Sequence, residues 1–438
     1  MKKVWMSLLA ILLVAVTAVT FVACSKDGGE EGGASGVNPK DPKKDVGVYE
    51  GGDGYPEINQ LLTWEAVNAF PIVHDGMTIE EGRKLCVDFF RFCKKDALWM
   101  PNDTYEYKIK EANEKVESVE GSVPYAGLPY ISLASGNIYR LMDYMDPETG
   151  VVDMEVIGLK PKLFGNQCSF GSYVGMGRVI NSADYSWTKG MTPINGFIKV
   201  GDYDLMDVNT FTSGGYNTTQ TMVDNGPDKM FEAYAGLKAG DVIVYFTTAG
   251  HVVVISGDAV VERDAKGNIN PKTSYVTVID QTPGHSQATN AAGDTFNYER
   301  NVDAKWDFQK LFDGKYVPYT FAEWQGTDPI ESSKTTFSHT GETISLSQLY
   351  SSTVESNYGV MDIYASFYNK NGVEVYKMAV RAESTSLKSL KFKSVGGNLD
   401  TWGDVESLDP SKYEYTVKIY AQISTGERPT LWEGKLVK

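Results

Sequence analysis

The C-terminal part of the chain, residues 332–438, alternates apolar and polar residues in several short runs. These runs read TISLSQLY, GVMDIYASFYN, VYKMAVRA, YEYTVKIYAQI and LWEGKLV, and turn-forming residues such as NKNG separate them. An alternating pattern places apolar side chains on one face of a β-strand. The pattern therefore predicts an all-β sandwich for this part of the chain.

The central part of the chain changes from a helical pattern to a strand pattern. In residues 56–121, the segment TIEEGRKLCVDFFRFCKKDALWM carries Thr78 and Glu81 at capping-box spacing, followed by apolar residues at helical spacing. Further on, DVIVYF, HVVVIS and SYVTVID are short β-branched runs separated by turn residues. These patterns predict an α+β unit over residues 56–331, with a helical N-terminal part and a core at 122–330.

The N-terminus has the pattern of an export signal. Lys2 and Lys3 precede an apolar run that ends in FVAC, where the cysteine is Cys24. This pattern predicts a signal peptide over residues 1–23. FVAC resembles a lipobox, which implies that Cys24 is acylated; the alternative is an ordinary transmembrane anchor. Residues 24–55 are rich in Gly, Ser, Pro and charge, and this composition predicts a flexible tether.

Charge, composition and the lipobox limit where the protein is located and which partners it binds. The hydrophobic content of 42% indicates a globular chain, and a net charge of −16 without a Lys/Arg stripe argues against nucleic acid. The lipobox implies a cell-envelope protein that is anchored in outer-membrane lipid through Cys24 and faces the periplasm or the cell surface. Acidic residues soon after Cys24 also resemble the surface-export signals of some Gram-negative lipoproteins.

The cysteines differ in what their surroundings predict. Cys86 and Cys93 are seven residues apart on the predicted helix, which separates them by about 10.5 Å and excludes a disulfide. We expect both to be buried core thiols, and no metal ligands cluster around them. Cys168 has no evident partner, and an unpaired cysteine in an exported protein is a candidate nucleophile. A buried core thiol is the alternative.

The residues around Cys168 suit a nucleophile. It follows Asn166 and Gln167 and opens a segment in which Gly171 and Gly175 would let a helix lie close to a sheet. At a helix N-terminus, unpaired N–H groups and the helix dipole stabilise a thiolate. The same N–H groups can receive an oxyanion, and the Gln167 or Asn166 side chain could add a donor.

His251 is the best candidate for a general base. It starts the apolar run HVVVIS directly after a glycine, so the side chain would be held rigidly near the surface. The other histidines lie in less suitable segments: His74, His285 and His339. A third group normally orients the imidazole, and Asp280 or Gln281 could do so. Neighbouring residues on a strand face opposite ways, so only one of the two can face His251.

These motifs resemble a known family over about residues 122 to 282. GNQCSFGSYVGMGRVIN is similar to the nucleophile segment of CHAP domains, the cysteine- and histidine-dependent amidohydrolase/peptidases. LKAGDVIVYF and GHVVVIS resemble that family's Gly-Asp strand and Gly-His strand, and YVTVIDQ lies where the family places an acidic residue. NlpC-type cell-wall peptidases share this order. YAGLPYISLASG resembles their segment whose tyrosine, here Tyr130, reaches the active site.

The chain departs from the family pattern at three positions. Asn166 intervenes between the glycine and the glutamine of the Gly-Gln-Cys run. Asp280 stands where CHAP domains usually have Glu, which shortens the reach to His251. Asn or Gln also serves as the third group in relatives, so Gln281 stays open. Gln167 replaces the Asp that helps many NlpC-type enzymes bind the free amine of their substrate, which puts that substrate in doubt.

The resemblance implies a papain-like fold and a thiolate acyl-enzyme mechanism without a metal or organic cofactor. We expect a cysteine amidase or peptidase, with peptidoglycan as the first candidate substrate. The alternative is a non-catalytic surface binding lipoprotein that keeps the fold. Its contacts could come from Tyr185, Trp187, Phe197 and Tyr203, although ordinary packing also explains these aromatics. The sandwich, which we interpret as Ig-like, would serve as a spacer or docking module.

Overall fold

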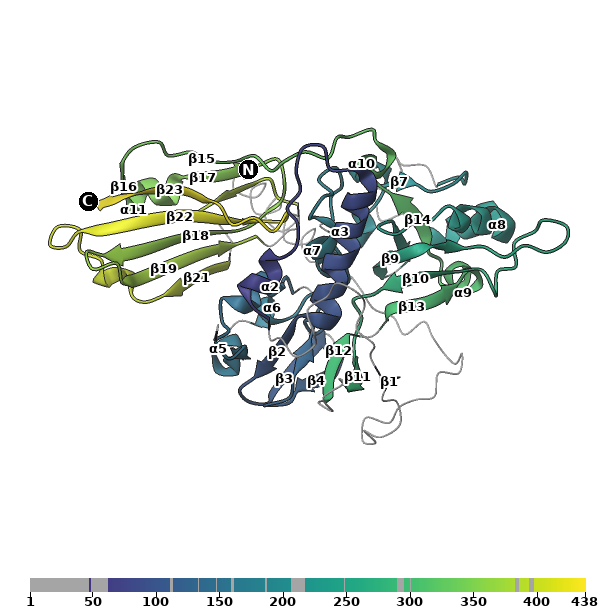
Figure 1. The fold of residues 1–438 in the computed structure, drawn as a ribbon, viewed down its shortest axis with the longest axis horizontal. Helices are drawn as coiled ribbons and strands as arrows, with labels where there is room; N and C mark the ends of the chain where they lie inside the picture. Colours follow the sequence, from purple (N-terminus) through teal and green to yellow (C-terminus); the bar gives the residue numbers. More distant parts are fainter. Residues whose placement is uncertain are drawn as a thin grey trace, which may run out of the picture.

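The structure is a computed structural model of the 438-residue chain. It describes residues 47–48, 62–110, 113–132, 134–146, 148–158, 161–185, 187–205, 217–247, 249–289, 295–299, 301–382, 386–393 and 398–438. The predicted signal peptide, Cys24 and nearly all of the predicted tether lie outside these residues. Figure 1 shows a mixed α/β arrangement of several sheets and few helices, with a β-rich C-terminal part at one end.

The long helix α3, Ile79–Arg91, begins at the capping box that the sequence predicts. The Thr78 backbone N–H donates to Glu81 Oε2 (2.8 Å), and the Glu81 N–H donates back to Thr78 Oγ1 (3.2 Å). A π-helical turn, Phe92–Asp96, continues the helix. Cys86 and Cys93 are free, buried thiols in the core, as predicted.

The prediction of a mainly helical segment over residues 56–121 is only partly correct. Helix α2, Trp64–Asn68, and α3 form, but the chain from Leu98 onward folds into strands. They are β2 (Leu98–Pro101), β3 (Tyr105–Lys110) and β4 (Asn113–Val119). YEYKIK alternates with a period of two and NEKVESV pairs with it in antiparallel register, and this pairing outweighs the helix-favouring Lys and Glu residues in both runs.

A six-stranded antiparallel sheet carries the predicted strands of the central part. Its strand order is β13-β10-β9-β8-β14-β7. The strands are β7 (Ile198–Lys199), β8 (Val242–Phe246), β9 (Gly250–Val260), β10 (Tyr275–Ile279), β13 (Val302–Asp307) and β14 (Val317–Thr320). Helix α8, Thr218–Ala235, packs against β8, β9 and β14, and α9, Phe308–Asp313, packs against β13 and α8.

A second six-stranded sheet has the order β1-β11-β12-β5-β2-β6. Its other strands are β1 (Gly47–Val48), β5 (Tyr125–Ala126), β6 (Val151–Val152), β11 (His285–Thr289) and β12 (Thr295–Glu299). The loop that follows β5 leads to three short helices: α4 (Ile138–Met142), α5 (Met154–Gly158) and α6 (Pro161–Phe164).

Helix α7, Cys168–Met176, lies between α3 and β9. An added Cβ at Gly175 would lie 2.4 Å from the Cβ of Phe90 on α3, and one at Gly171 would lie 3.2 Å from Gln281 Cγ. The close approach predicted for these glycines is therefore present. At Gly175, however, the partner is a helix rather than a sheet.

The C-terminal part contains two sheets. The larger has the order β16-β23-β22-β18-β19-β21 and the smaller has the order β15-β17-β20. Their strands are β15 (Thr335–Phe337), β16 (Thr343–Ser345), β17 (Thr353–Ser356), β18 (Val360–Asn369), β19 (Glu374–Arg381), β20 (Ser389–Lys391), β21 (Asn398–Trp402), β22 (Tyr415–Ile423) and β23 (Thr430–Val437). Residues 343–350 were expected to form one strand. They form β16 and then helix α11, Leu346–Ser351, because Ser345 and Gln348 make a capping box.

The C-terminal part packs directly on the helices of the rest of the chain. An added Cβ at Gly359 would lie 2.1 Å from the Tyr173 hydroxyl on α7, which shows how closely the two parts approach. Asp143, which caps the end of α4, accepts hydrogen bonds from Tyr364 and Arg381, both at 2.8 Å. This contact is buried, so the C-terminal sheets share an interior with the cysteine-bearing helix.

Candidate active site

Cys168 lies at the first position of α7, directly after the N-cap residue Gln167. This is the helix N-terminal position that the sequence predicts for a nucleophile. The Cys168 side chain is 0% exposed, and its Sγ lies 4.0 Å from Thr188 Oγ1. Thr188 opens a short 3₁₀ turn, Thr188–Gly190. The thiol is therefore buried in contact with this turn.

The same turn contacts the start of the histidine strand. An added Cβ at Gly250 would lie 2.8 Å from both Thr188 Cβ and Phe246 Cδ2, so only glycine fits between these two side chains. Gly250 directly precedes His251 on β9. Thr188 consequently contacts the nucleophile candidate on one side and the backbone beside the base candidate on the other.

His251 is paired with Asp280. Its Nε2 lies 2.6 Å from Asp280 Oδ1, and the two side chains are 14% and 4% exposed. When the Asp280 carboxylate accepts a hydrogen bond from Nε2–H, the imidazole lone pair is left on Nδ1. Asn301 Nδ2 donates to the second oxygen of Asp280 at 3.3 Å. The carboxylate is thus held from two sides while it orients the ring.

Gln281, the other candidate for the third group, points elsewhere. Its side chain is fully buried against Gly171 of α7, and its Nε2 donates to the Leu128 carbonyl at 3.1 Å. Asp280 and Gln281 therefore point to opposite sides, as expected for neighbouring residues on a strand. Asp280 faces His251, and Gln281 faces the helix that carries Cys168.

Asn166 and Tyr130 lie side by side on the approach to α7. The Asn166 N–H donates to the Pro129 carbonyl (3.1 Å), and the Ile131 N–H donates to the Asn166 carbonyl (3.1 Å). Both bonds flank Tyr130, which is buried. The structure therefore brings the segment of Tyr130 next to the cysteine segment.

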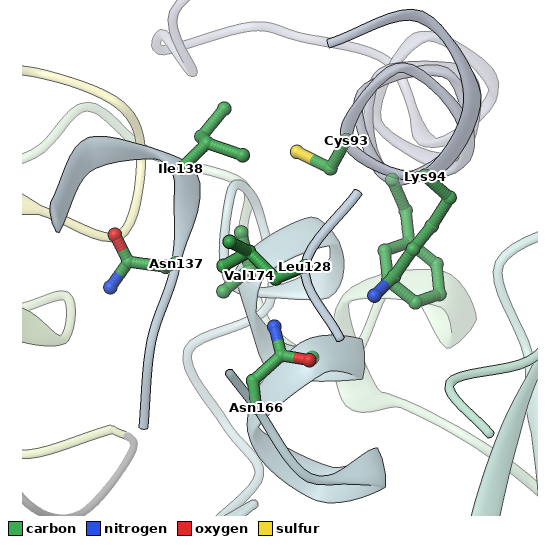
Figure 2. Close-up of a pocket in the computed structure, with 9 residues that line it drawn as sticks. Cys93, Lys94, Leu128, Asn137, Ile138, Asn166 and Val174 are labelled. Carbon is green, nitrogen blue, oxygen red and sulfur yellow. The ribbon is translucent and has the colours of Figure 1, made fainter. Parts of the chain in front are cut away.

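The Asn166 side chain lies behind α7. Its Oδ1 is 3.3 Å from the Cβ position of Gly171, and the residue lines a small buried cavity of about 10 Å³ with Lys94 and Cys93 (Figure 2). This volume is close to the minimum for one water molecule. Because the Asn166 amide is turned into the interior, Gln167, which is half-buried, is the better placed of the two predicted oxyanion donors.

Two lysines lie on aromatic rings in this region: Lys189 beside Phe246, which pairs with Gly250, and Lys310 close enough to Asp280 for their charges to interact. Lys189 Nζ lies 5.6 Å from the ring centroid of Trp187 and 5.9 Å from that of Phe246. Lys310 Nζ lies 4.1 Å from the Trp306 ring. Burial lowers the pKa of Lys310, and the nearby Asp280 carboxylate acts in the opposite direction.

Thr188 and Asn301 are site residues that sequence reasoning missed. Thr188 lies in a polar stretch without motif or periodicity, and only the folded chain brings it to Cys168. Asn301 adopts a left-handed backbone (φ 57°), a conformation in which asparagine is enriched. That preference marks a turn but does not indicate contact with Asp280. Of the aromatics considered for a groove, Tyr185, Phe197 and Tyr203 are buried, and Trp187 is 41% exposed.

Metal and membrane features are absent from the part of the chain that the structure describes. There, no three His, Cys, Asp or Glu side chains gather closely enough to hold a metal ion. Among the same residues, no helix has the length and apolar character needed to cross a membrane. No protein-family model matches the sequence, and no curated protein matches it significantly.

Proposed function

We propose that the chain is an exported, lipid-anchored cysteine hydrolase of amide bonds with a papain-like core. In this proposal Cys168 is the nucleophile, His251 the base and Asp280 the residue that orients the imidazole. The observation that carries the proposal is the 2.6 Å contact between His251 and Asp280. Gly250, the residue before His251, packs on Thr188, and Thr188 in turn contacts Cys168. A nucleophile, a base and an orienting group form a catalytic triad when the base is within hydrogen-bond reach of both partners, and the His251–Asp280 contact supports one of these two links.

The reaction would proceed in two steps. His251 takes the thiol proton, and the Cys168 thiolate attacks the amide carbonyl carbon, so that an S–C bond forms. The C–N bond then breaks, and His251 gives its proton to the leaving amine. Water, deprotonated by His251, next attacks the thioester, the S–C bond breaks, and the acid and the free thiol are released. The N–H groups of the first turn of α7 would hold the oxyanion in both steps.

Catalysis requires the turn over Cys168 to move. The thiol is fully buried beneath Thr188, and an amide carbonyl must approach within bonding distance of Sγ. The turn is short, and Trp187 beside it is exposed, so displacement of the turn would uncover the thiol without unfolding α7. Turns of this kind gate the active sites of many enzymes.

Location and family resemblance support peptidoglycan as the substrate. The predicted signal peptide and the predicted acylation of Cys24 would anchor the protein in the cell envelope, on the periplasmic or the outer face. Peptidoglycan there offers amide bonds in its stem peptides and at the link between sugar and peptide. Asp280 and Gln167 differ from the residues that the family has at these positions. The bond that the protein cleaves must therefore be identified by analysis of its products.

The test compares residues 25–438 with the Cys168→Ala variant on purified peptidoglycan digests. Muropeptide products that appear with the wild type alone support the proposal, and their masses identify the bond. His251→Ala should lose the same products. If wild type and Cys168→Ala yield identical mass spectra on these digests, peptidoglycan is excluded as the substrate.

A non-catalytic binding protein is the second candidate, and the complete burial of Cys168 favours it. The exposed apolar side chains of Trp187 (41%) and Ile194 (61%) would then belong to a contact surface rather than to a moving cover. Thiol labelling separates the two candidates. A binding protein leaves Cys168 as inert as Cys86, whereas a gated nucleophile reacts whenever the turn opens.

A further inference from the structure

We propose that Lys189 forms an anion-binding subsite beside Cys168, and that the protein selects amide substrates that carry a carboxylate near the bond to be cut. This inference rests on the proposed function, because it names the substrate class of the same site. It goes beyond that function in assigning specificity to a residue outside the triad.

The position of Lys189 links it to the reacting groups. It follows Thr188, whose Oγ1 lies 4.0 Å from the Cys168 thiol, on a turn closed by the hydrogen bond from the Gly190 N–H to the Trp187 carbonyl (2.9 Å). Its ammonium lies over Phe246, which packs on Gly250. Lys189 therefore belongs to the same turn that contacts Cys168, and a group bound at Lys189 would lie at this turn rather than at a remote surface.

The charge of Lys189 is not neutralised within the described residues. No carboxylate there lies within ion-pair distance of its ammonium, although the chain as a whole has a net charge of −16. Other cations of the folded part have acid partners: Arg83 pairs with Asp241 (3.0 Å), and Lys377 pairs with Asp143 (3.2 Å). A cation without an acid partner beside an active site is available to a ligand.

Aromatic rings hold the ammonium in place without cancelling its charge. The Trp187 and Phe246 rings lie on Lys189 at centroid distances of 5.6 and 5.9 Å, within the range of cation–π attraction. Trp187 packs on Gly190 of the same turn, since an added Cβ at Gly190 would lie 2.7 Å from its Nε1, so the ring and the ammonium belong to one unit that moves with the turn. Lys310 differs, because the Asp280 carboxylate offsets its charge. Lys189 is therefore the better anion receptor of the two.

The test uses the Cys168 thiol as a reporter, so it does not require turnover. Iodoacetate and iodoacetamide alkylate a thiolate by the same displacement of iodide, but only iodoacetate carries a carboxylate. Both reagents need the same opening of the turn, so the ratio of their rates isolates the charge effect. The rates are read by mass spectrometry of the Cys168 peptide, for wild type, Lys189→Met, Lys189→Arg and the control Lys305→Met. Lys305 also lies over an aromatic ring, that of Tyr275 (4.6 Å), but on an outer strand of the sheet.

We expect the iodoacetate-to-iodoacetamide rate ratio to fall about three- to fivefold in Lys189→Met. This fold-change corresponds to the interaction free energy of a partly exposed pair of opposite charges. Lys189→Arg and Lys305→Met should keep the wild-type ratio, and added salt should reduce the ratio in wild type but not in Lys189→Met. An unchanged ratio in Lys189→Met overturns the subsite. If the ratio falls but no amide is hydrolysed, the subsite stands and the proposed hydrolase function fails.

Discussion

Arg140 and Asp362 form an ion pair in which both side chains are fully buried. Arg140 Nη2 lies 2.8 Å from Asp362 Oδ1, and Nε donates to the same oxygen at 2.9 Å. The remaining guanidinium hydrogens reach the carbonyls of Ser135, Met361 and Ala382. Arg140 lies on α4 and Asp362 on β18, so this pair joins the C-terminal sheet to the cysteine-bearing part through a shared interior. A detachable spacer would not need such a contact.

Removing one partner of this pair should be strongly destabilising. Asp362→Ala leaves the Arg140 charge buried without its counter-ion, which we expect to lower the free energy of unfolding by about 3–5 kcal/mol. Urea denaturation measures the loss. Glu433→Ala is the matched control, because its pair with Lys418 (3.2 Å) is half exposed and should contribute less than about 1 kcal/mol. Equal losses in the two variants would contradict a shared interior.

Asp143 should make stability depend on pH in the acid range. Burial by itself raises the pKa of Asp143, but Arg381, Lys377 and Arg428 outweigh burial and hold the pKa at about 2. A lowered pKa contributes stability above the unfolded-state value of 3.8, and that contribution is lost as the pH falls from about 4 to about 2. We expect the contribution to be about 2 kcal/mol at neutral pH.

Denaturant unfolding of wild type and Asp143→Asn at several pH values tests this expectation. The difference in unfolding free energy between the two should be constant above pH 5 and should shrink toward pH 2. Asp328→Asn, which changes an exposed carboxylate, should not differ from wild type at any pH. A wild-type advantage over Asp143→Asn that persists unchanged at pH 2 would refute the assignment.

Local patterns predicted the elements of the site. The capping box at Thr78 located α3, the β-branched runs located β8 and β9, and the small residues after Cys168 located α7. These features are encoded by residues a few positions apart, where spacing alone determines which side chains can meet. The strands β3 and β4 were missed because both runs are rich in Lys and Glu and only the short run of β3 alternates.

Contacts between distant segments were not predictable from spacing. Strand alternation indicated that Asp280 and Gln281 face opposite ways, but only the pairing of β9 with β10 decides which of them meets His251. Thr188 reaches Cys168 through a turn without any motif, and Arg140 pairs with a residue 222 positions further along the chain. Such contacts depend on how the helices and strands pack together. This packing cannot be deduced from residue spacing in a single sequence.

Alkylation of Cys168 should be limited by the turn that covers it. Thr188→Ala removes the hydroxyl and methyl groups packed on Sγ and Gly250, so we expect iodoacetamide to label Cys168 several-fold faster than in wild type. Thr192→Ala is the matched control, because Thr192 is equally buried in the same segment. The labelling rate is read by mass spectrometry of the Cys168 peptide.

The other thiols serve as an internal reference in that experiment. Burial raises the pKa of Cys93 to about 12 and that of Cys86 further, so both stay protonated at pH 8 and should remain unlabelled in the folded protein. Labelling of Cys168 at the same slow rate in wild type, Thr188→Ala and Thr192→Ala would show that the turn is not the barrier.

Asp280 and Gln281 should differ sharply in their effect on catalysis. Asp280→Asn can donate an amide hydrogen to Nε2 and so favours the wrong imidazole tautomer, which should lower kcat/KM by about 10²- to 10⁴-fold. Gln281→Met keeps the volume packed on Gly171 and gives up only the hydrogen bond to the Leu128 carbonyl, so kcat/KM should change little. Both rates come from the muropeptide product assay, with circular dichroism to confirm folding. If a folded Gln281→Met loses activity while Asp280→Asn keeps it, Gln281 rather than Asp280 is the orienting group.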